Sequence, residues 1–375
     1  MKLPPFKLER YFAKYEFKAE FLLCSSDCEA MSIEDLLALE PGAEEQLKQT
    51  WLGYTESQGH PALRKEIAGI YETIQPEEIL VHSGAEEAIF LFMLAVLEEN
   101  DHIIVHAPHY QSLSEVAKGM GCEVSLWEAR EENRWALDLD ELKNLRRPNT
   151  KAIVINTPHN PTGYLVSRTD FDSVNRYARE HSLLLFCDEV YRESEYDLGM
   201  RLPAGCDMGE HAVSLGVTSK TYGLAGLRIG WLATKNKTIY EKMASLKDYT
   251  TICNSAPSEF LAEVAVRNRQ KLIARNLGII RNNLEIIDDL FNRHNSLFSW
   301  VRPVAGSMGF PRLLTGDIEE FCDDLVKKEG VLLLPGTMYD DPDNHFRIGL
   351  GRRSLPQAVE RLENYLVSSL VNRKS

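Results

Sequence analysis

Short apolar runs alternate with amphipathic segments along most of the chain, and this pattern predicts strands and helices in turn. Strands are predicted at residues 79–82, 102–106, 123–127, 151–156, 183–187 and 212–216, and a further apolar run opens at Ile229. Helices are predicted from Pro61 onwards, at residues 88–97 and at residues 169–181. Strands that alternate with helices indicate an α/β fold with a mostly parallel sheet.

The pattern changes in the last third of the chain. Residues 236–295 are charged and helical in character, and they include a long amphipathic run at residues 258–295. Short strands are then predicted at residues 300–304, 309–313, 331–334 and 345–351, with helices at residues 317–329 and 355–371. We therefore predict a large domain at residues 46–280, and a smaller α+β domain made of residues 1–45 and 281–375.

The composition is ordinary for a soluble globular protein, with 44% hydrophobic and 26% charged residues among 375. The formal net charge of −14 argues against nucleic acid as a partner. No apolar run approaches the roughly 20 residues that a bilayer span needs, and the N-terminal segment lacks the apolar core of a signal peptide. These features predict a cytoplasmic protein with no membrane partner.

The cysteines form an odd and scattered set, which predicts free thiols in a cytoplasmic protein. They lie at positions 24, 28, 122, 187, 206, 253 and 322. Cys24 and Cys28 are close in sequence, but no second pair of Cys or His lies near them, so we predict no metal site.

A lysine occupies an unusual place after the predicted strand at residues 212–216. Lys220 lies in a polar, glycine-rich turn, and Arg228 follows eight residues later, just before the next apolar run. An ammonium group between two buried strands is costly to desolvate. The cost is offset if the amine forms a Schiff base with a carbonyl cofactor, and Arg228 would then suit a phosphate group.

Two other places favour a bound anion or ligand. Residues 83–86 (Ser-Gly-Ala-Glu) join a predicted strand to a helix, where free backbone N–H groups and the positive helix end face an incoming anion. Asp188 ends a buried strand, and ligands of open α/β sheets bind outside the carboxyl ends of the strands.

Two segments resemble the class I/II aminotransferases, which are fold-type I enzymes dependent on pyridoxal phosphate (PLP). They are S-K-T-Y-G-L-A-G-L-R-I-G-W at residues 219–231 and N-T-P-H-N-P-T-G at residues 156–163. The resemblance covers about residues 50–370, and it implies PLP and a mostly parallel seven-stranded sheet. The short N-terminal region around residues 22–26 resembles the smaller capreomycidine synthase-like relatives more than it resembles aspartate aminotransferase.

The resemblance assigns roles around the cofactor ring. Lys220 holds PLP as a Schiff base and moves the α-proton of the substrate. Asp188 faces the pyridine nitrogen and keeps it protonated. Tyr191 and Asn160 contact the ring hydroxyl oxygen, and Tyr110 stacks on the ring.

The resemblance also assigns residues to the cofactor phosphate. These are Gly84, Ala85, Glu86, Ser219 and Arg228. Many relatives carry serine or threonine three residues before the lysine as a phosphate ligand, whereas this chain has Val217 there. The hydroxyl contact is therefore either missing or supplied by Thr218 or Ser219.

The substrate and the partner subunit are assigned in the same way. Arg347 binds the substrate carboxylate together with Asn160, and Ser25 or Ser26 offers its backbone to the same group, with Ser26 preferred. Tyr54 reaches the cofactor phosphate of a neighbouring subunit, which implies a homodimer with shared active sites. His159 is predicted as a turn residue that lines the pocket, with a role as general base as the alternative.

The resemblance implies amino transfer between an L-amino acid and a 2-oxo acid. A carbon–sulfur lyase or a cyclase would use the same carbanion, and the sequence does not distinguish these outcomes or the substrate side chain. A PLP-binding sensor domain is disfavoured, because the chain has no additional DNA-binding module and no basic face.

Overall fold

A seven-stranded sheet forms the centre of the larger part of the molecule. The computed structural model describes residues 1–372. The strands are β1 (Ile79–His82), β2 (His102–Ala107), β3 (Glu123–Glu128), β4 (Thr150–Asn156), β5 (Leu184–Asp188), β6 (Ala212–Val217) and β7 (Gly230–Thr234). Their order is β1-β7-β6-β5-β4-β2-β3, and only β7 runs antiparallel to its neighbours. The prediction of a mostly parallel α/β sheet is confirmed.

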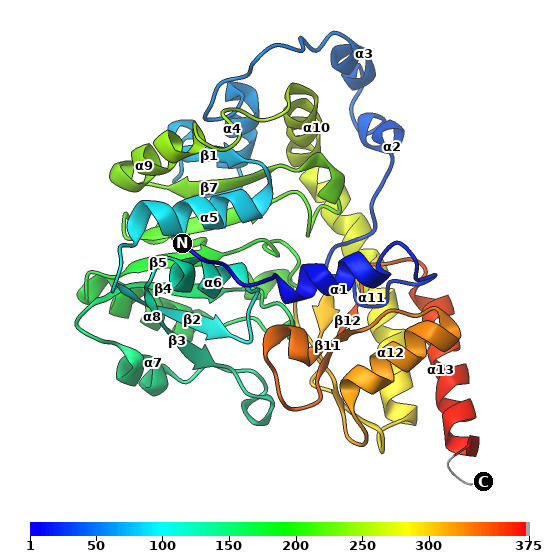
Figure 1. The fold of residues 1–375 in the computed structure, drawn as a ribbon. Coiled ribbons are helices and arrows are strands. Elements are labelled where there is room, and N and C mark those ends of the chain that lie inside the picture. Colours follow the sequence, from blue (N-terminus) through cyan, green and yellow to red (C-terminus); the bar gives the residue numbers. More distant parts are fainter. Residues whose placement is uncertain (373–375) are drawn as a thin grey trace.

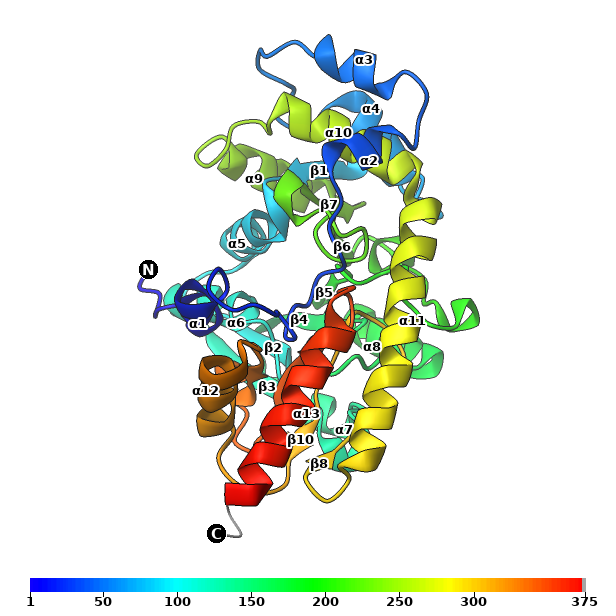
Figure 2. The ribbon, with the colours of Figure 1, turned by 90° about the vertical axis from the view of Figure 1, so that its right-hand side faces the viewer.

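Helices cover both faces of this sheet (Figures 1 and 2). They are α4 (Pro61–Ala68), α5 (Gly84–Val96), α6 (Ser112–Gly119), α7 (Leu139–Leu145), α8 (Arg168–Glu180), α9 (Lys237–Lys247) and α10 (Ala256–Arg267). Because side chains alternate along a strand, Leu80 packs with α5, α6 and α9, whereas Ile79 and Val81 pack with α4 and α10. Most strands are therefore buried on both faces, as is usual in a parallel sheet, whereas the edge strand β3 is partly exposed.

The C-terminal elements form a second layer beside the sheet. They are α11 (Arg269–Arg293), α12 (Ile318–Glu329), α13 (Leu355–Asn372) and the short strands β8 (Phe298–Ser299), β9 (Met308–Gly309), β10 (Arg312–Leu313), β11 (Leu334–Pro335) and β12 (Phe346–Gly349). The long helix α11 runs from the sheet to these elements (Figure 2). The predicted domain boundary at residue 280 falls inside α11, and the domain limits remain a prediction.

The N-terminal segment contacts both parts of the molecule. Helix α1 (Lys7–Tyr15) lies against the C-terminal elements, where the Tyr15 hydroxyl donates to Asp323 Oδ1 at 2.6 Å. Helices α2 (Ile33–Leu37) and α3 (Ala43–Lys48) instead pack near α4 and α10 (Figure 1).

Three predicted elements differ from the structure. The strand expected at residues 300–304 is absent, because Val304 N–H donates to the carbonyl of Gly163 instead of to a neighbouring strand. The strand expected at residues 309–313 is divided at Pro311, which has no N–H to donate to a ladder. The helix expected at residues 88–97 begins earlier, at Gly84.

All seven cysteines are free thiols, as predicted. Within residues 1–372, none of the helices has the combination of length and apolar character that crossing a membrane requires.

Candidate active site

A cavity of about 420 Å³ opens at the carboxyl ends of the central strands. Asn156, Asp188 and Val217, which end β4, β5 and β6, line its floor. The first turn of α5 and the inner face of α1 form its walls. The cavity therefore lies outside the carboxyl ends of the strands, where open α/β sheets bind their ligands.

Lys220 reaches into this cavity from the turn after β6. Its Nζ donates to Ser26 Oγ at 2.9 Å and lies 5.8 Å from the centroid of the Tyr191 ring. Burial lowers the pKa of Lys220, while the nearby Asp27 carboxylate opposes that change. A depressed pKa leaves more of the amine neutral and nucleophilic, which suits attack on a carbonyl group.

Asp188 is a buried carboxylate without a cationic partner. It is 5% exposed, and Oδ1 accepts only the Val190 N–H, at 3.3 Å. Burial raises the pKa of Asp188 to about 7. No ion pair of Asp188 occurs within residues 1–372, so a cationic nitrogen that enters the cavity would satisfy this carboxylate.

A buried hydroxyl group without a hydrogen-bond partner faces the cavity. Ser219 Oγ is buried, lines the cavity and has no hydrogen-bond partner within residues 1–372. The Thr218 hydroxyl instead donates within its own turn, to the carbonyls of Leu224 and Ile229 at 3.4 and 3.1 Å. Of the two hydroxyls considered for a phosphate contact in place of Val217, Ser219 is thus the unpaired one and Thr218 is already bonded, and a phosphate contact at Ser219 stays a prediction.

The turn before α5 has no room for a side chain. A Cβ on Gly84, whose φ is +79°, would lie 2.5 Å from Nη2 of Arg228. The Arg228 guanidinium therefore lies directly over the first turn of α5, whose backbone N–H groups are free to bind an anion. Ala85 and Glu86 continue this turn and line the cavity. Glu86 accepts from the Ser112 hydroxyl at 3.1 Å, and burial raises its pKa.

Another part of the cavity holds a buried arginine. Arg347 is 2% exposed, and its Nε donates to the carbonyl of Cys24 at 2.9 Å. Its Nη1 donates to Asn160 Oδ1 at 3.2 Å and also contacts the Tyr339 hydroxyl. These bonds fix the guanidinium fork in a geometry suited to a carboxylate.

Tyr339 was not predicted from the sequence. Its hydroxyl also donates to Asn160 Oδ1 at 3.1 Å, so it joins two residues that the sequence did predict. Tyr339 follows β11 in a short turn with no recognisable motif, and only the tertiary structure brings it to this position.

His159 does not line the cavity, contrary to the prediction. Its ring is fully buried, with Nδ1 2.7 Å from Thr162 Oγ1 and Nε2 2.8 Å from the carbonyl oxygen of Pro108. It stacks on the His106 ring at 3.8 Å, and burial lowers its pKa to about 3. Both ring nitrogens are engaged within the turn, so His159 is not placed to act as the base.

The predicted tyrosines separate into two groups. Tyr110 and Tyr191 line the cavity, and the Tyr110 hydroxyl donates to Glu9 Oε1 at 3.4 Å. Tyr54 is 90% exposed and lies outside this cavity, beside Trp51 in a separate depression.

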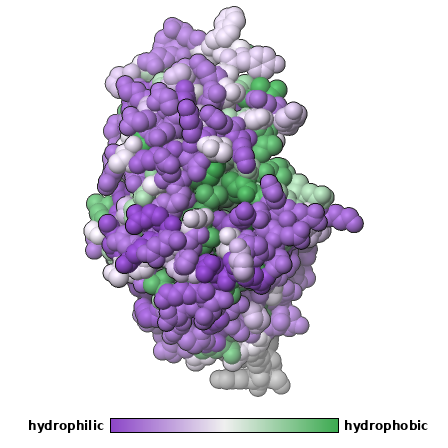
Figure 3. All heavy atoms as spheres, turned by 90° about the vertical axis from the view of Figure 1, so that its left-hand side faces the viewer, coloured by the Kyte–Doolittle hydropathy of each residue, from purple (hydrophilic) through white to green (hydrophobic). Residues whose placement is uncertain are grey.

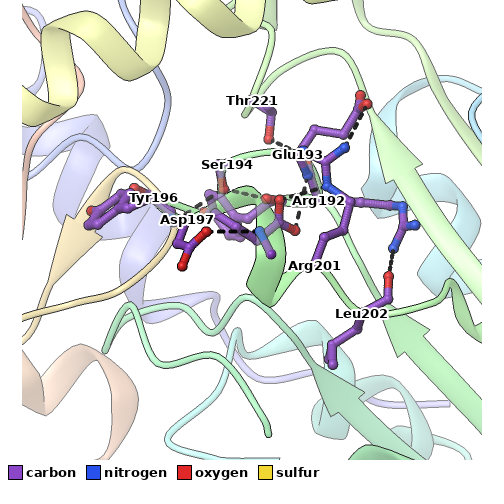
Figure 4. A network of polar contacts seen from close by, with 12 residues as sticks. Arg192, Glu193, Ser194, Tyr196, Asp197, Arg201, Leu202 and Thr221 are labelled. Carbon is purple, nitrogen blue, oxygen red and sulfur yellow. Dashed lines mark hydrogen bonds and ion pairs between the residues drawn. The ribbon is translucent and has the colours of Figure 1, made fainter. Parts of the chain in front are cut away.

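A polar network behind the cavity holds the Lys220 turn in place (Figure 4). The Thr221 hydroxyl donates to the carbonyl of Arg192 at 2.9 Å, which joins this turn to the one that carries Tyr191. The Tyr222 hydroxyl donates to Glu193 Oε2 at 3.0 Å. Glu189 is structural, because it accepts the Gly205 N–H at 2.8 Å away from the cavity.

The family model for class I and II aminotransferases matches residues 20–362. The chain belongs to this family. A PLP-dependent aminotransferase from Streptococcus suis superposes with a TM-score of 0.92 at 33% identity, over 98% of this chain and 99% of the other. The PLP-dependent cyclase OrfR superposes with a TM-score of 0.90 at 28% identity, over 98% of both chains.

A curated relative gives a second view of the same family. Capreomycidine synthase of Streptomyces vinaceus is 29% identical over 351 residues, which cover 92% of this chain and 89% of the relative. The fold of this aminotransferase family member is fold type I, and its cofactor is pyridoxal phosphate. The cavity fits that cofactor, because within residues 1–372 Ser219 Oγ is buried there without a hydrogen-bond partner and the Asp188 carboxylate is buried there without an ion pair.

Proposed function

We propose that this enzyme transfers an amino group between an L-amino acid and a 2-oxo acid. The observation that carries the proposal is the arrangement of Lys220 and Arg347 in one cavity, where Lys220 donates to Ser26 and Arg347 donates to Asn160. A carboxylate fixed at Arg347 would present its neighbouring carbon to the Lys220 amine.

The residues divide into those that hold the cofactor and those that act on the substrate. Ser219, Arg228 and the first turn of α5 would hold the phosphate, and Asp188 would bind the ring nitrogen. Tyr110, Tyr191 and Asn160 would contact the ring. When bound, pyridoxal phosphate supplies a reactive carbonyl carbon and a ring that accepts electrons.

The chain's own contribution to the reaction is orientation and proton transfer. Arg347 orients the substrate carboxylate, and its bonds to Cys24 and Asn160 keep it from following the substrate. Lys220 Nζ takes the proton from the substrate Cα and returns it, which its lowered pKa makes easier near neutral pH.

Cyclisation is a second candidate, favoured by the likeness to the cyclase OrfR and to capreomycidine synthase. The same residues would take the Cα proton, but no 2-oxo acid would be consumed. Elimination, as in a carbon–sulfur lyase, would likewise proceed without an acceptor and would release ammonia.

A donor and acceptor panel separates these reactions. With 2-oxoglutarate present, we expect at least one L-amino acid to yield its 2-oxo acid together with an equal amount of glutamate. The products are measured by chromatography, with and without the acceptor. Ammonia release or a cyclic product that forms without any acceptor would contradict amino transfer.

We also propose that the enzyme acts as a homodimer with shared sites. Trp51 and Tyr54 are 85% and 90% exposed, which is unusual for large aromatic side chains in a monomer. Apolar side chains also gather in a hollow at mid-height on a mostly hydrophilic face (Figure 3). A second copy would cover such surfaces, and Tyr54 would then reach the neighbour's phosphate.

Complementation tests this role of Tyr54. Tyr54→Ala and Lys220→Ala chains, each inactive alone, are expected to regain activity when they are mixed and refolded together. A hybrid dimer then contains one site with both residues intact, so roughly a quarter of the wild-type activity is expected if hybrids form statistically. Hybrid dimers without recovered activity would place Tyr54 in its own subunit's site or in the fold alone.

A further inference from the structure

Helix α1 presents a mixed stripe of side chains to the active-site cavity. Leu8, Phe12 and Glu16 are spaced four residues apart, so they share one face, and all three line the cavity. The Phe12 ring centroid lies 5.9 Å from Cζ of Arg347. The stripe therefore leads from the proposed carboxylate site over apolar surface to an acidic side chain.

Two further carboxylates, those of Glu9 and Asp27, line the same cavity. We call Glu9, Glu16 and Asp27 together the acidic wall. Asp27 is paired with Arg352, whose Nη2 lies 3.0 and 2.9 Å from its two oxygens. Glu9 accepts from the Tyr110 hydroxyl at 3.4 Å. Within residues 1–372, the Glu16 side chain takes part in no hydrogen bond or ion pair.

The surroundings of Glu16 are short of positive charge. Burial raises the pKa of Glu16, the Asp27 and Glu9 carboxylates raise it further, and only Arg352 opposes them. Arg352 is already engaged by Asp27, as described above. A cation placed at this wall would relieve the repulsion and meet a carboxylate that lacks a partner.

The cationic side chains in the cavity do not fill this role. Lys220, Arg228 and Arg347 line the cavity, but the first donates to Ser26 and the last to Cys24 and Asn160. Arg228 lies over the first turn of α5. Each of these groups also has a function in the reaction proposed above, so the acidic wall remains available to the substrate.

We propose that the amino-acid substrate has a long apolar stem that ends in a positive charge, a guanidinium or an ammonium group, and that Glu16 recognises this charge. The stem would pack on Leu8 and Phe12, as the methylene groups of such side chains do on apolar surface. Glu9 and Asp27 add to the negative potential. This inference rests on the proposed function, because it takes Arg347 as the carboxylate anchor.

Binding of unreactive analogues to the holoenzyme tests the proposal. The compounds 5-guanidinopentanoate and 6-aminohexanoate lack an α-amino group and so cannot react at Cα, and 5-ureidopentanoate and hexanoate are their counterparts with an uncharged far end. Calorimetry is expected to show at least one cationic compound binding about tenfold or more tighter than its counterpart, as a charge-assisted contact would give. L-arginine and L-citrulline, compared by kcat/KM, give a second readout.

Glu16→Gln is the decisive variant, since it keeps size and removes the charge. The cationic preference is expected to fall at least several-fold in Glu16→Gln. Glu20→Gln is the matched control, because Glu20 is exposed nearby and lies outside the cavity, and it should keep the preference. Equal affinities for both members of each pair, or binding of none of them, would overturn the proposal, and an undiminished preference in Glu16→Gln would overturn the role of Glu16.

Different results would contradict the proposal of amino transfer and the proposal of a cationic substrate. If no amino acid transfers its amino group but the cationic analogues still bind more tightly, amino transfer is contradicted and the acidic wall is supported. If neutral amino acids react as well as cationic ones, amino transfer is supported and the acidic wall is contradicted.

Discussion

Lys220→Ala is expected to abolish amino transfer while leaving the cofactor bound. The groups assigned to the phosphate, Ser219 and Arg228 among them, are untouched by this change. Lys220 is the only lysine within residues 1–372 that lines the cavity, so the substitution leaves no side-chain amine there. Loss of proton transfer alone costs roughly 10²–10⁴-fold in rate, and loss of the covalent attachment adds to it.

The measurements are bound pyridoxal phosphate per chain and product formed in a single turnover. In the wild-type enzyme, borohydride should attach the cofactor covalently, and peptide mapping should place the label on Lys220. Lys237→Ala is the control, because Lys237 is exposed at the start of α9 and lies outside the cavity. A label on another lysine, or near-normal turnover by Lys220→Ala, would contradict the assignment.

The sequence predicts those parts of the fold whose contacts are local. Most strands of the large sheet are short apolar runs, and the Lys220 turn follows one of them directly, so both can be identified without tertiary contacts. The strands of the C-terminal part were predicted less well. Strands such as β9 and β10 have only two residues each, which is too short for a hydrophobic period to emerge.

Residues whose place depends on distant contacts were missed or misplaced. Tyr339 donates a hydrogen bond to Asn160, which lies 179 positions away in the sequence, and no local sequence pattern indicates this contact. His159 lies in a recognised motif, but its ring direction is set by the carbonyl of Pro108, 51 positions away. The acidic wall could not be predicted from the sequence either, because its place depends on how α1 lies against the cavity.

Asp188→Asn is expected to slow proton removal from the substrate by orders of magnitude. Asparagine keeps the size and shape of Asp188 but removes the charge that would hold the ring nitrogen protonated. The ring then accepts electrons poorly, and each 1.36 kcal/mol lost from transition-state stabilisation lowers the rate about tenfold. The residues assigned to the phosphate, and Lys220 itself, remain, so the cofactor should stay bound.

The same substitution should stabilise the cofactor-free protein. Burial raises the pKa of Asp188 from 3.8 to about 7, so the folded protein binds this proton more tightly than the unfolded chain does. Stability is therefore lost as pH rises from about 4 to 7, and the full cost is present above pH 7. Asparagine removes that cost, and the rise in Tm should be larger at pH 8 than at pH 5.

Two measurements on the same variant separate the mechanistic role of Asp188 from its structural one. Loss of α-deuterium from labelled substrate in a single turnover reports proton removal, and bound cofactor per chain reports occupancy. Glu189→Gln is the control, because it alters a neighbouring buried carboxylate outside the cavity and should leave deuterium loss near normal. If Asp188→Asn retains normal deuterium loss at full occupancy, Asp188 does not bind the ring nitrogen, and its burial without a cation would need another partner.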